Sequence, residues 1–342
     1  MPMIKEGIAK VIRGVDLQPL EAAVIMREIM QGEATGAQIA SFLTALRCKG
    51  ETVEEIASCA EVMRELAQPI NISCRPLVDT CGTGGDGSGT FNISTTVAFV
   101  VAGAGLAVAK HGNRSVSSKS GSADLLEELG VNLKLGPEGV KKCIEEIGIG
   151  FLFAPNFHLA MKHALGPRRE MGIRTIFNLL GPLTNPARAQ IQVLGVYDEQ
   201  LTVPLAEVLL RLGVKSAFVV HGAGGLDEFS TLGKNRVASL KEGRVSSFCL
   251  HPGDLGISAA SPGQLKGGSP RKNARITFGI LKGEDPGPGR DIVLLNAAAA
   301  LVAGGRASDL AEGIEVAEES ILSGQAMKKL QDLINLSGTL AA

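Results

Sequence analysis

Residues 79–95 read DTCGTGGDGSGTFNIST, a glycine-rich loop between a short apolar run at 77–78 and a helical pattern at 93–102. Glycines let the main chain approach an anion closely, and the amides at a helix N-terminus carry partial positive charge. The stretch therefore predicts a phosphate-binding loop between a strand and a helix.

The same strand and helix pattern continues along the chain. Short apolar runs alternate with helical patterns, with the runs at 77–78, 106–109, 131–135, 149–153, 191–196 and 217–220 and the helical patterns at 93–102, 123–129 and 140–147. Such alternation predicts an α/β domain with a mostly parallel central sheet, and ligands of these sheets bind beyond the carboxyl ends of the strands. Residues 235–250 are expected to add an antiparallel pair.

Residues 1–70 predict a small, all-helical N-terminal domain. The clearest helix covers 53–67, where Thr52 and Glu55 match a capping box. Helices from about 157–188 are expected to complete this domain, with the segment GPLTNPA at 181–187 breaking the helical pattern. Residues 71–342 are then expected to form the α/β domain.

Composition excludes several classes of function. The net charge of the 342 residues is −1, and the chain has one Tyr and no Trp, so it lacks the basic footprint and stacking platform of a nucleic-acid-binding protein. The longest mostly apolar run, 97–109, is shorter than the roughly 20 residues that a membrane span needs. The absence of an export signal and of CxxC pairs predicts a cytoplasmic protein with reduced thiols.

Two familiar phosphate motifs do not fit the glycine loop. A Walker loop needs Lys at position 88, where the chain has Ser88. The spacing of Gly82, Gly84 and Gly87 matches a dinucleotide fold, but the next strand leads into Lys110 instead of the acidic residue that binds the ribose. An ordinary glycine turn is the remaining alternative.

Acidic residues are missing where an anion would bind. No Asp or Glu occurs at 87–123 or at 147–169, and the first of these stretches carries Lys110, Arg114 and Lys119 among serines. Cations and hydroxyls suit phosphate oxygens, which predicts a polyphosphorylated substrate. Asp227 and Glu228 follow a later strand and are candidate ligands for Mg²⁺, which commonly bridges carboxylates and phosphates.

Four segments together resemble the anthranilate phosphoribosyltransferases of tryptophan biosynthesis: DTCGTGGDGSGTFNIST at 79–95, KHGNRSVSSKSGSADLLEELG at 110–130, RTIFNLLGPLTNPA at 174–187 and GLDEFS at 225–230. The resemblance runs over nearly the whole chain. It implies transfer of a phosphoribosyl group from 5-phosphoribosyl 1-diphosphate to anthranilate, with two Mg²⁺ ions per subunit. It also implies a homodimer formed through the helical domain and a fold similar to pyrimidine nucleoside phosphorylases.

The resemblance assigns roles to individual residues. It implies that phosphoribosyl diphosphate is bound by Gly82, Gly85, Asp86, Thr90, Asn92, Ile93, Ser94, Thr95, Lys110, His111, Gly112, Asn113, Arg114, Ser115, Val116, Ser117, Ser118 and Ser122. It implies anthranilate contacts from Gly82, Asn113 and Arg168, and metal contacts from Ser94, Asp227 and Glu228.

Displacement of pyrophosphate through an oxocarbenium-like state needs positioning and charge stabilisation more than a strong base. His111 is the candidate catalytic residue, orienting the amine or accepting its proton, and a hydrogen bond within its own loop is the alternative role. Cys81 has no evident helper group for a nucleophile. Two rival functions are a pyrimidine nucleoside phosphorylase and a non-catalytic relative that binds nucleic acid.

Overall fold

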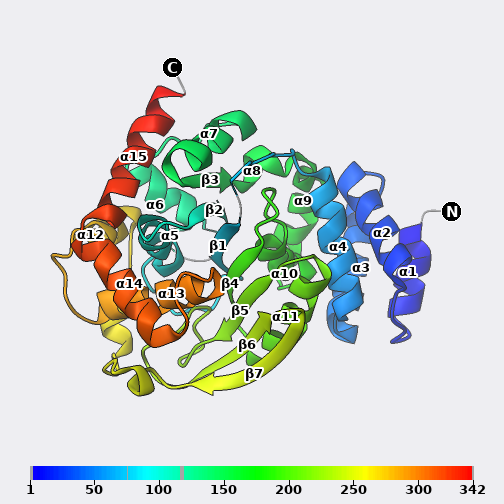
Figure 1. The fold of residues 1–342 in the computed structure, drawn as a ribbon. Coiled ribbons are helices and arrows are strands. Elements are labelled where there is room, and N and C mark those ends of the chain that lie inside the picture. Colours follow the sequence, from blue (N-terminus) through cyan, green and yellow to red (C-terminus); the bar gives the residue numbers. More distant parts are fainter. Residues whose placement is uncertain (1–2, 75, 116–118, 341–342) are drawn as a thin grey trace.

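The computed structural model describes residues 3–74, 76–115 and 119–340. Four helices at the N-terminus form a bundle on one side of the molecule, and two later helices pack against it (Figure 1). The bundle comprises α1 (Met3–Val11), α2 (Pro19–Gln31), α3 (Gly36–Lys49) and α4 (Val53–Leu66), joined by α9 (Lys162–Met171) and α10 (Ile176–Leu183).

The capping box predicted before α4 is present. The Thr52 hydroxyl accepts the Glu55 amide at 3.2 Å, and the Glu55 carboxylate accepts the Thr52 amide at 2.8 Å. The same buried carboxylate accepts the Leu17 amide at 2.9 Å and pairs with Lys49 at 3.0 Å. Glu55 therefore starts one helix and also ties it to its neighbours.

The α/β part is built on one seven-stranded sheet in the order β3-β2-β1-β4-β5-β6-β7. Its first five strands are parallel and its last two are antiparallel, with bounds β1 (Leu77–Gly82), β2 (Ala107–Gly112), β3 (Ile149–Phe153), β4 (Ile191–Gly195), β5 (Ser216–His221), β6 (Asn235–Lys241) and β7 (Arg244–Leu250). The chain runs outward from β1 to β3 and then returns to the other side of β1 as β4. The boundary between β1 and β4 is thus a topological switch point, where open α/β sheets bind ligands.

Helices cover both faces of the sheet (Figure 1). One face packs against α5 (Ile93–Gly103) and α13 (Pro288–Ala303), and the opposite face packs against α11 (Thr202–Arg211) and the bundle. The remaining helices are α6 (Ser122–Glu128), α7 (Pro137–Ile147), α8 (Ala154–Phe157), α12 (Pro270–Leu281), α14 (Leu310–Leu322) and α15 (Gln325–Thr339), and short 3₁₀ turns lie at Leu159–Met161, Glu199–Leu201, Pro252–Leu255 and Pro262–Leu265.

Strand β4 belongs to two apolar clusters. Ile191 and Val193 lie in the cluster that contains α5 and α13, whereas Leu194 and, just after the strand, Val196 lie in the cluster that contains the bundle and α11. This division follows from the alternation of side chains across a strand. The helical bundle and one face of the sheet therefore share an apolar cluster, and β4 lies between this cluster and the second one.

Two local predictions were wrong. The apolar run at 131–135 forms no strand, because side chains bond to its backbone. The Asn132 amide donates to the Ser337 hydroxyl at 3.1 Å, and the Asn156 side-chain amide donates to the carbonyls of Leu133 and Leu135. Helix α10 continues through Gly181 and Pro182 before it ends. Within the described residues, no helix is long and apolar enough to cross a membrane.

Candidate functional site

The site forms where β1 and β4 end side by side, with Gly82 opposite Gly195. A Cβ atom at Gly82 would lie 2.3 Å from Asp227 Oδ2, and one at Gly195 would lie 1.5 Å from the Asp227 carbonyl oxygen. Only glycine at both positions lets the segment after β5 lie across the two strand ends. This close approach brings the Asp227 carboxylate to the switch point.

The glycine loop after β1 is fixed by its backbone conformation and by hydrogen bonds to two carboxylates. Gly84 and Gly85 adopt left-handed φ angles of 69° and 72°, a conformation that glycine adopts without strain. Asp227 Oδ2 accepts the Gly84 amide at 2.6 Å, and Asp86 Oδ1 accepts the Ser88 amide at 3.1 Å. The predicted phosphate loop is thus connected directly to the candidate metal carboxylate.

Helix α5 begins next to the same carboxylates. The Ser94 amide donates to Glu228 Oε1 at 3.1 Å, and the Ser94 carbonyl accepts the Thr80 hydroxyl at 2.9 Å. Ile93 and Thr95, on either side of Ser94, are buried. The positive end of α5 therefore faces Glu228.

Asn92 joins three segments around the start of α5. Its Oδ1 atom accepts the Asn273 amide group at 2.8 Å and the Ser120 hydroxyl at 3.2 Å, and its Nδ2 atom donates to the Ser120 carbonyl at 3.0 Å. Thr90 lies at a β-bridge with Lys266. These contacts fix the loop after β1 against the loop after β2.

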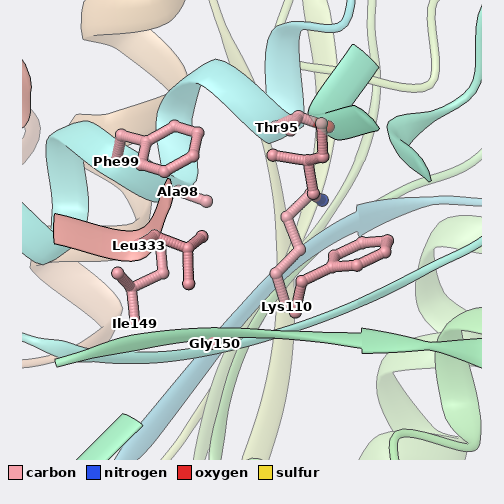
Figure 2. Close-up of a pocket in the computed structure, with 9 residues that line it drawn as sticks. Thr95, Ala98, Phe99, Lys110, Ile149, Gly150 and Leu333 are labelled. Atoms are coloured by element: carbon pink, nitrogen blue, oxygen red, sulfur yellow. The ribbon is translucent and has the colours of Figure 1, made fainter. Parts of the chain in front are cut away.

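Strand β2 supplies the central cation. Lys110 is buried, and its Nζ atom donates to the Thr80 carbonyl at 2.5 Å and to the Ser94 hydroxyl at 3.4 Å. Figure 2 shows the Lys110 side chain reaching from β2 towards Thr95. The cavity that both residues line has a volume of about 10 Å³, which is too small for a substrate. Burial raises the pKa of Glu228, and the positive charge of Lys110 offsets only part of that rise.

His111 lies at the end of β2 as a buried, neutral imidazole. Its amide donates to Asp79 Oδ1 at 3.3 Å, and its ring centroid is 5.1 Å from that of His158. Burial, followed by the neighbouring His158, holds the pKa of His111 well below the ordinary histidine value. Among the described residues, the buried Nε2 atoms of both rings have no hydrogen-bond partner. Such a ring is a weak base and suits an orienting role better than proton removal.

The segment after His111 is partly engaged with α6. Arg114 pairs with Asp124 at 2.9 Å and with Glu127 at 2.7 Å. Ser115 donates its amide to Asp124 at 3.0 Å, and the Ser122 hydroxyl donates to the Asn113 carbonyl at 3.2 Å. Gly112 ends β2 against the Ser122 side chain. The predicted site residues Val116, Ser117 and Ser118 lie outside the described residues.

Asp227 and Glu228 form the acidic part of the site. Burial raises the pKa of both carboxyls, and the like charge of Asp86 raises that of Asp227 further. Crowded carboxylates with raised pKa values are stabilised by a divalent cation, and Mg²⁺ commonly takes one or two carboxylates plus substrate oxygens and water. The donor set therefore fits Mg²⁺, although among the described residues no three His, Cys, Asp or Glu side chains converge as metal ligands.

Arg168 projects from α9, in the part of the molecule that packs on the bundle. Its guanidinium carbon lies 4.9 Å from the centre of the Phe177 ring, and burial lowers its pKa. The neighbouring Arg169 is exposed. The half-buried, ring-stacked position of Arg168 distinguishes it from its neighbour as the candidate carboxylate-binding residue.

Sequence reasoning missed a buried polar pair beneath the site. Asp79 is fully buried in β1, and its Oδ2 atom accepts the Asn185 side-chain amide at 2.8 Å. Asn185 also donates to the Ala109 carbonyl at 2.7 Å, so the pair joins β1, β2 and the segment after α10. Burial raises the pKa of Asp79 to about 6. A polar residue inside an apolar strand was the available signal.

Comparison with known proteins agrees with this geometry. Residues 5–67 match the helical bundle domain of the glycosyl transferase family, and residues 74–327 match its a/b domain. The chain is 54% identical over 339 residues to anthranilate phosphoribosyltransferase of Petrotoga mobilis, covering 99% of this chain and 98% of that relative. It is 55% identical over 349 residues to the enzyme of the same name from Geobacter sulfurreducens, covering 98% and 99%.

The chain belongs to the anthranilate phosphoribosyltransferase family. The structure of anthranilate phosphoribosyltransferase from Thermus thermophilus matches with a TM-score of 0.93 and 46% identity, covering 98% of this chain and 99% of that one. The Saccharomyces cerevisiae anthranilate phosphoribosyltransferase in complex with PRPP and Mg matches with a TM-score of 0.90 and 31% identity, covering 98% of both chains. The predicted family and the predicted helical and α/β architecture are confirmed.

Proposed function

We propose that this chain is an anthranilate phosphoribosyltransferase that transfers the phosphoribosyl group of 5-phosphoribosyl 1-diphosphate to the amino group of anthranilate, in tryptophan biosynthesis. One observation carries the proposal. At the β1–β4 switch point, Asp227 contacts the glycine loop and Glu228 contacts the start of α5, while the Lys110 ammonium reaches Ser94 between them. Amides, a cation and two carboxylates thus meet where a diphosphate and its metal would bind.

The phosphoribosyl diphosphate site extends over three segments. The glycine loop and the start of α5 offer backbone amides, Lys110 offers a buried ammonium, and the loop after β2 offers hydroxyl and amide groups. We assign to this site Gly82, Gly85, Asp86, Thr90, Asn92, Ile93, Ser94, Thr95, Lys110, His111, Gly112, Asn113, Arg114, Ser115, Val116, Ser117, Ser118 and Ser122. In this assignment Arg114 exchanges its contacts with Asp124 and Glu127 for the substrate.

We assign Mg²⁺ to Asp227, Glu228 and Ser94. Asp227 contacts the glycine loop and Glu228 contacts the start of α5. We propose two ions per subunit, as the family resemblance implies. When bound, Mg²⁺ supplies positive charge to the diphosphate oxygens. Asp227, Glu228 and Ser94 would position the ion, and the glycine loop would keep the diphosphate beside Lys110.

Anthranilate is assigned to Gly82, Asn113 and Arg168. The guanidinium of Arg168 suits the benzoate carboxylate, because a planar cation pairs with a carboxylate through two hydrogen bonds. In the reaction, the amine nitrogen forms a bond to the anomeric carbon and the bond from that carbon to pyrophosphate breaks. The amine loses one proton, which the departing pyrophosphate accepts. Lys110 and the loop amides stabilise the departing negative charge. The neutral ring of His111 orients the amine.

We further propose a homodimer formed through the helical bundle and a cytoplasmic location. Ile12 and Leu20 are 69% and 75% exposed on the bundle, and a partner subunit would cover them. The six cysteines carry free thiols, which is typical of a reducing compartment. Light scattering of the purified protein distinguishes a dimer from a monomer.

One assay tests the activity. We expect the fluorescence of anthranilate to fall when the protein is mixed with phosphoribosyl diphosphate and Mg²⁺, and the chain contains no Trp to add background emission. Phosphate-dependent cleavage of thymidine or uridine without consumption of anthranilate would instead favour a nucleoside phosphorylase. Strongly salt-dependent DNA binding without turnover would favour a non-catalytic relative.

A further inference from the structure

Arg174 holds the glycine loop from outside. It lies between α9 and α10, and its Nη2 atom donates a hydrogen bond to the carbonyl of Gly85. The guanidinium also fills the space beside that glycine, because a Cβ at Gly85 would lie 3.3 Å from Nη2. A side chain 89 residues away in the sequence therefore fixes one peptide group of the loop.

The ring of Tyr197 supports the guanidinium. The Arg174 Cζ atom lies 4.2 Å from the centre of this ring, within the range of a cation–π contact. Tyr197 follows β4, and its amide donates to the Thr83 hydroxyl at 3.2 Å, while the Thr83 amide donates to the Gly195 carbonyl at 3.0 Å. The platform under Arg174 is thus attached to the start of the loop that Arg174 holds.

The hydrogen bond to Gly85 determines where the next amide points. The Gly85 carbonyl and the Asp86 N–H belong to one planar trans peptide, so the two groups face opposite directions. With the carbonyl bonded to Arg174, the Asp86 N–H faces away from Arg174. Glycine at 84 and 85 permits rotation of this peptide, and Arg174 selects one orientation.

Within the described residues, two other anchors of the loop bond to different groups. Asp227 holds the Gly84 amide, and Lys266 donates to the Ser88 carbonyl at 2.8 Å on the far side of the loop. Neither reaches the carbonyl of Gly85. Loss of the Arg174 contact would leave the peptide between 85 and 86 without its anchor while the rest of the loop stays attached.

We propose that Arg174, seated on Tyr197, is a positioning residue that orients the Gly85–Asp86 peptide for binding the diphosphate of the substrate. This inference rests on the proposed function. It assigns Arg174 to binding of phosphoribosyl diphosphate and to neither anthranilate binding nor the chemical step.

Substitution tests this assignment. In Arg174→Met we expect the KM for phosphoribosyl diphosphate to rise about tenfold, because a charge-assisted hydrogen bond is lost, with kcat changed less than about twofold. The KM for anthranilate and the thermal midpoint should stay the same, since Arg174 is exposed. Lys282→Met is the matched control, because Lys282 also lies over a ring, 4.9 Å from the centre of Phe278, but contacts no part of the loop.

The ring beneath Arg174 gives a second test. Tyr197→Phe keeps the aromatic platform and should bind phosphoribosyl diphosphate as the unchanged protein does, whereas Tyr197→Leu should weaken binding. Combined with Arg174→Met, Tyr197→Leu should add little further loss, because both substitutions remove the same contact. Full additivity in the double variant would overturn the inference.

Tyr197 is the single tyrosine in a chain without tryptophan, so its emission reports this contact directly. When phosphoribosyl diphosphate and Mg²⁺ are added without anthranilate, the tyrosine emission of the unchanged protein should change. The same titration of Arg174→Met should give a weaker apparent affinity. Calorimetry under the same conditions gives the dissociation constants. Equal affinity of the two proteins would overturn the role of Arg174, whereas no binding by the unchanged protein would contradict the proposed function itself.

Discussion

Asp227 Oδ2 lies 2.6 Å from the amide nitrogen of Gly84, so the carboxylate assigned to the metal also holds the phosphate loop. A cation that engages this carboxylate would release the Gly84 N–H towards the diphosphate. Metal and substrate are therefore expected to bind together more tightly than either binds alone, because each frees a group that the other uses.

Removal of the two carboxylates tests the metal assignment. We expect Asp227→Asn combined with Glu228→Gln to lower kcat/KM at least about a hundredfold, since the charges proposed to hold Mg²⁺ are lost. The amide oxygens still accept from Gly84 and Ser94, so circular dichroism should show an intact fold. Calorimetry of Mg²⁺ with phosphoribosyl diphosphate should show weakened binding, and unchanged rates at saturating Mg²⁺ would refute the assignment.

Arg168 and Arg169 form a matched pair of substitutions. Arg168→Ala should raise the KM for anthranilate about tenfold or more, because a paired cation is removed, and should affect the KM for phosphoribosyl diphosphate much less. Arg169→Ala, at an exposed neighbouring position, should leave both values nearly unchanged. Steady-state kinetics with each substrate varied in turn decides between them. Equal effects of the two substitutions would move the anthranilate site elsewhere.

Asn185→Ala should destabilise the fold in a pH-dependent way. It removes a hydrogen bond to the buried Asp79 carboxylate, at a cost of about 2 kcal/mol when that group is charged. The pKa of Asp79 is raised to about 6, so the group is protonated below that pH and the loss shrinks. Urea unfolding at pH values of about 5 and 8 should show the larger difference from the unchanged protein at pH 8. An equal difference at both values would contradict this account.

The buried histidines should make the protein sensitive to acid. Burial lowers the pKa of His158 to about 4, so the folded state binds a proton less readily than the unfolded chain does. The free energy of unfolding then falls as the pH drops from about 6.5 towards 4, by up to about 1.4 kcal/mol per pH unit for each group. Thermal melts of His158→Gln should show a shallower fall, and His251→Gln, at an exposed position, serves as control.

The local features of the site were predictable, and its long-range contacts were not. The glycine loop, Lys110 and the Asp227–Glu228 pair carry their chemistry in short segments, so residue type and spacing indicate them. The contact of Asp227 with Gly82 and Gly195 depends on β4 returning beside β1, which no local pattern specifies. The hydrogen bond from Arg174 to Gly85 likewise depends on how the bundle packs on the sheet.

The buried network beneath the site was unpredictable for a related reason. Asp79 stands in the motif that indicates the phosphate loop, yet its partner Asn185 comes 106 residues later, in a segment that signals a turn. An isolated polar residue in an apolar strand indicates that a partner exists without indicating which one. The run at 131–135 shows the converse, because side chains rather than a neighbouring strand bond to its backbone.

The two faces of β4 have a consequence for how the molecule unfolds. Since Leu194 and Val196 pack with the bundle while Ile191 and Val193 pack with α5 and α13, neither half keeps its apolar interior if the other melts. The helical bundle and the α/β part should therefore unfold in a single cooperative step. A fragment that ends after α4 should expose apolar surface and aggregate instead of folding alone.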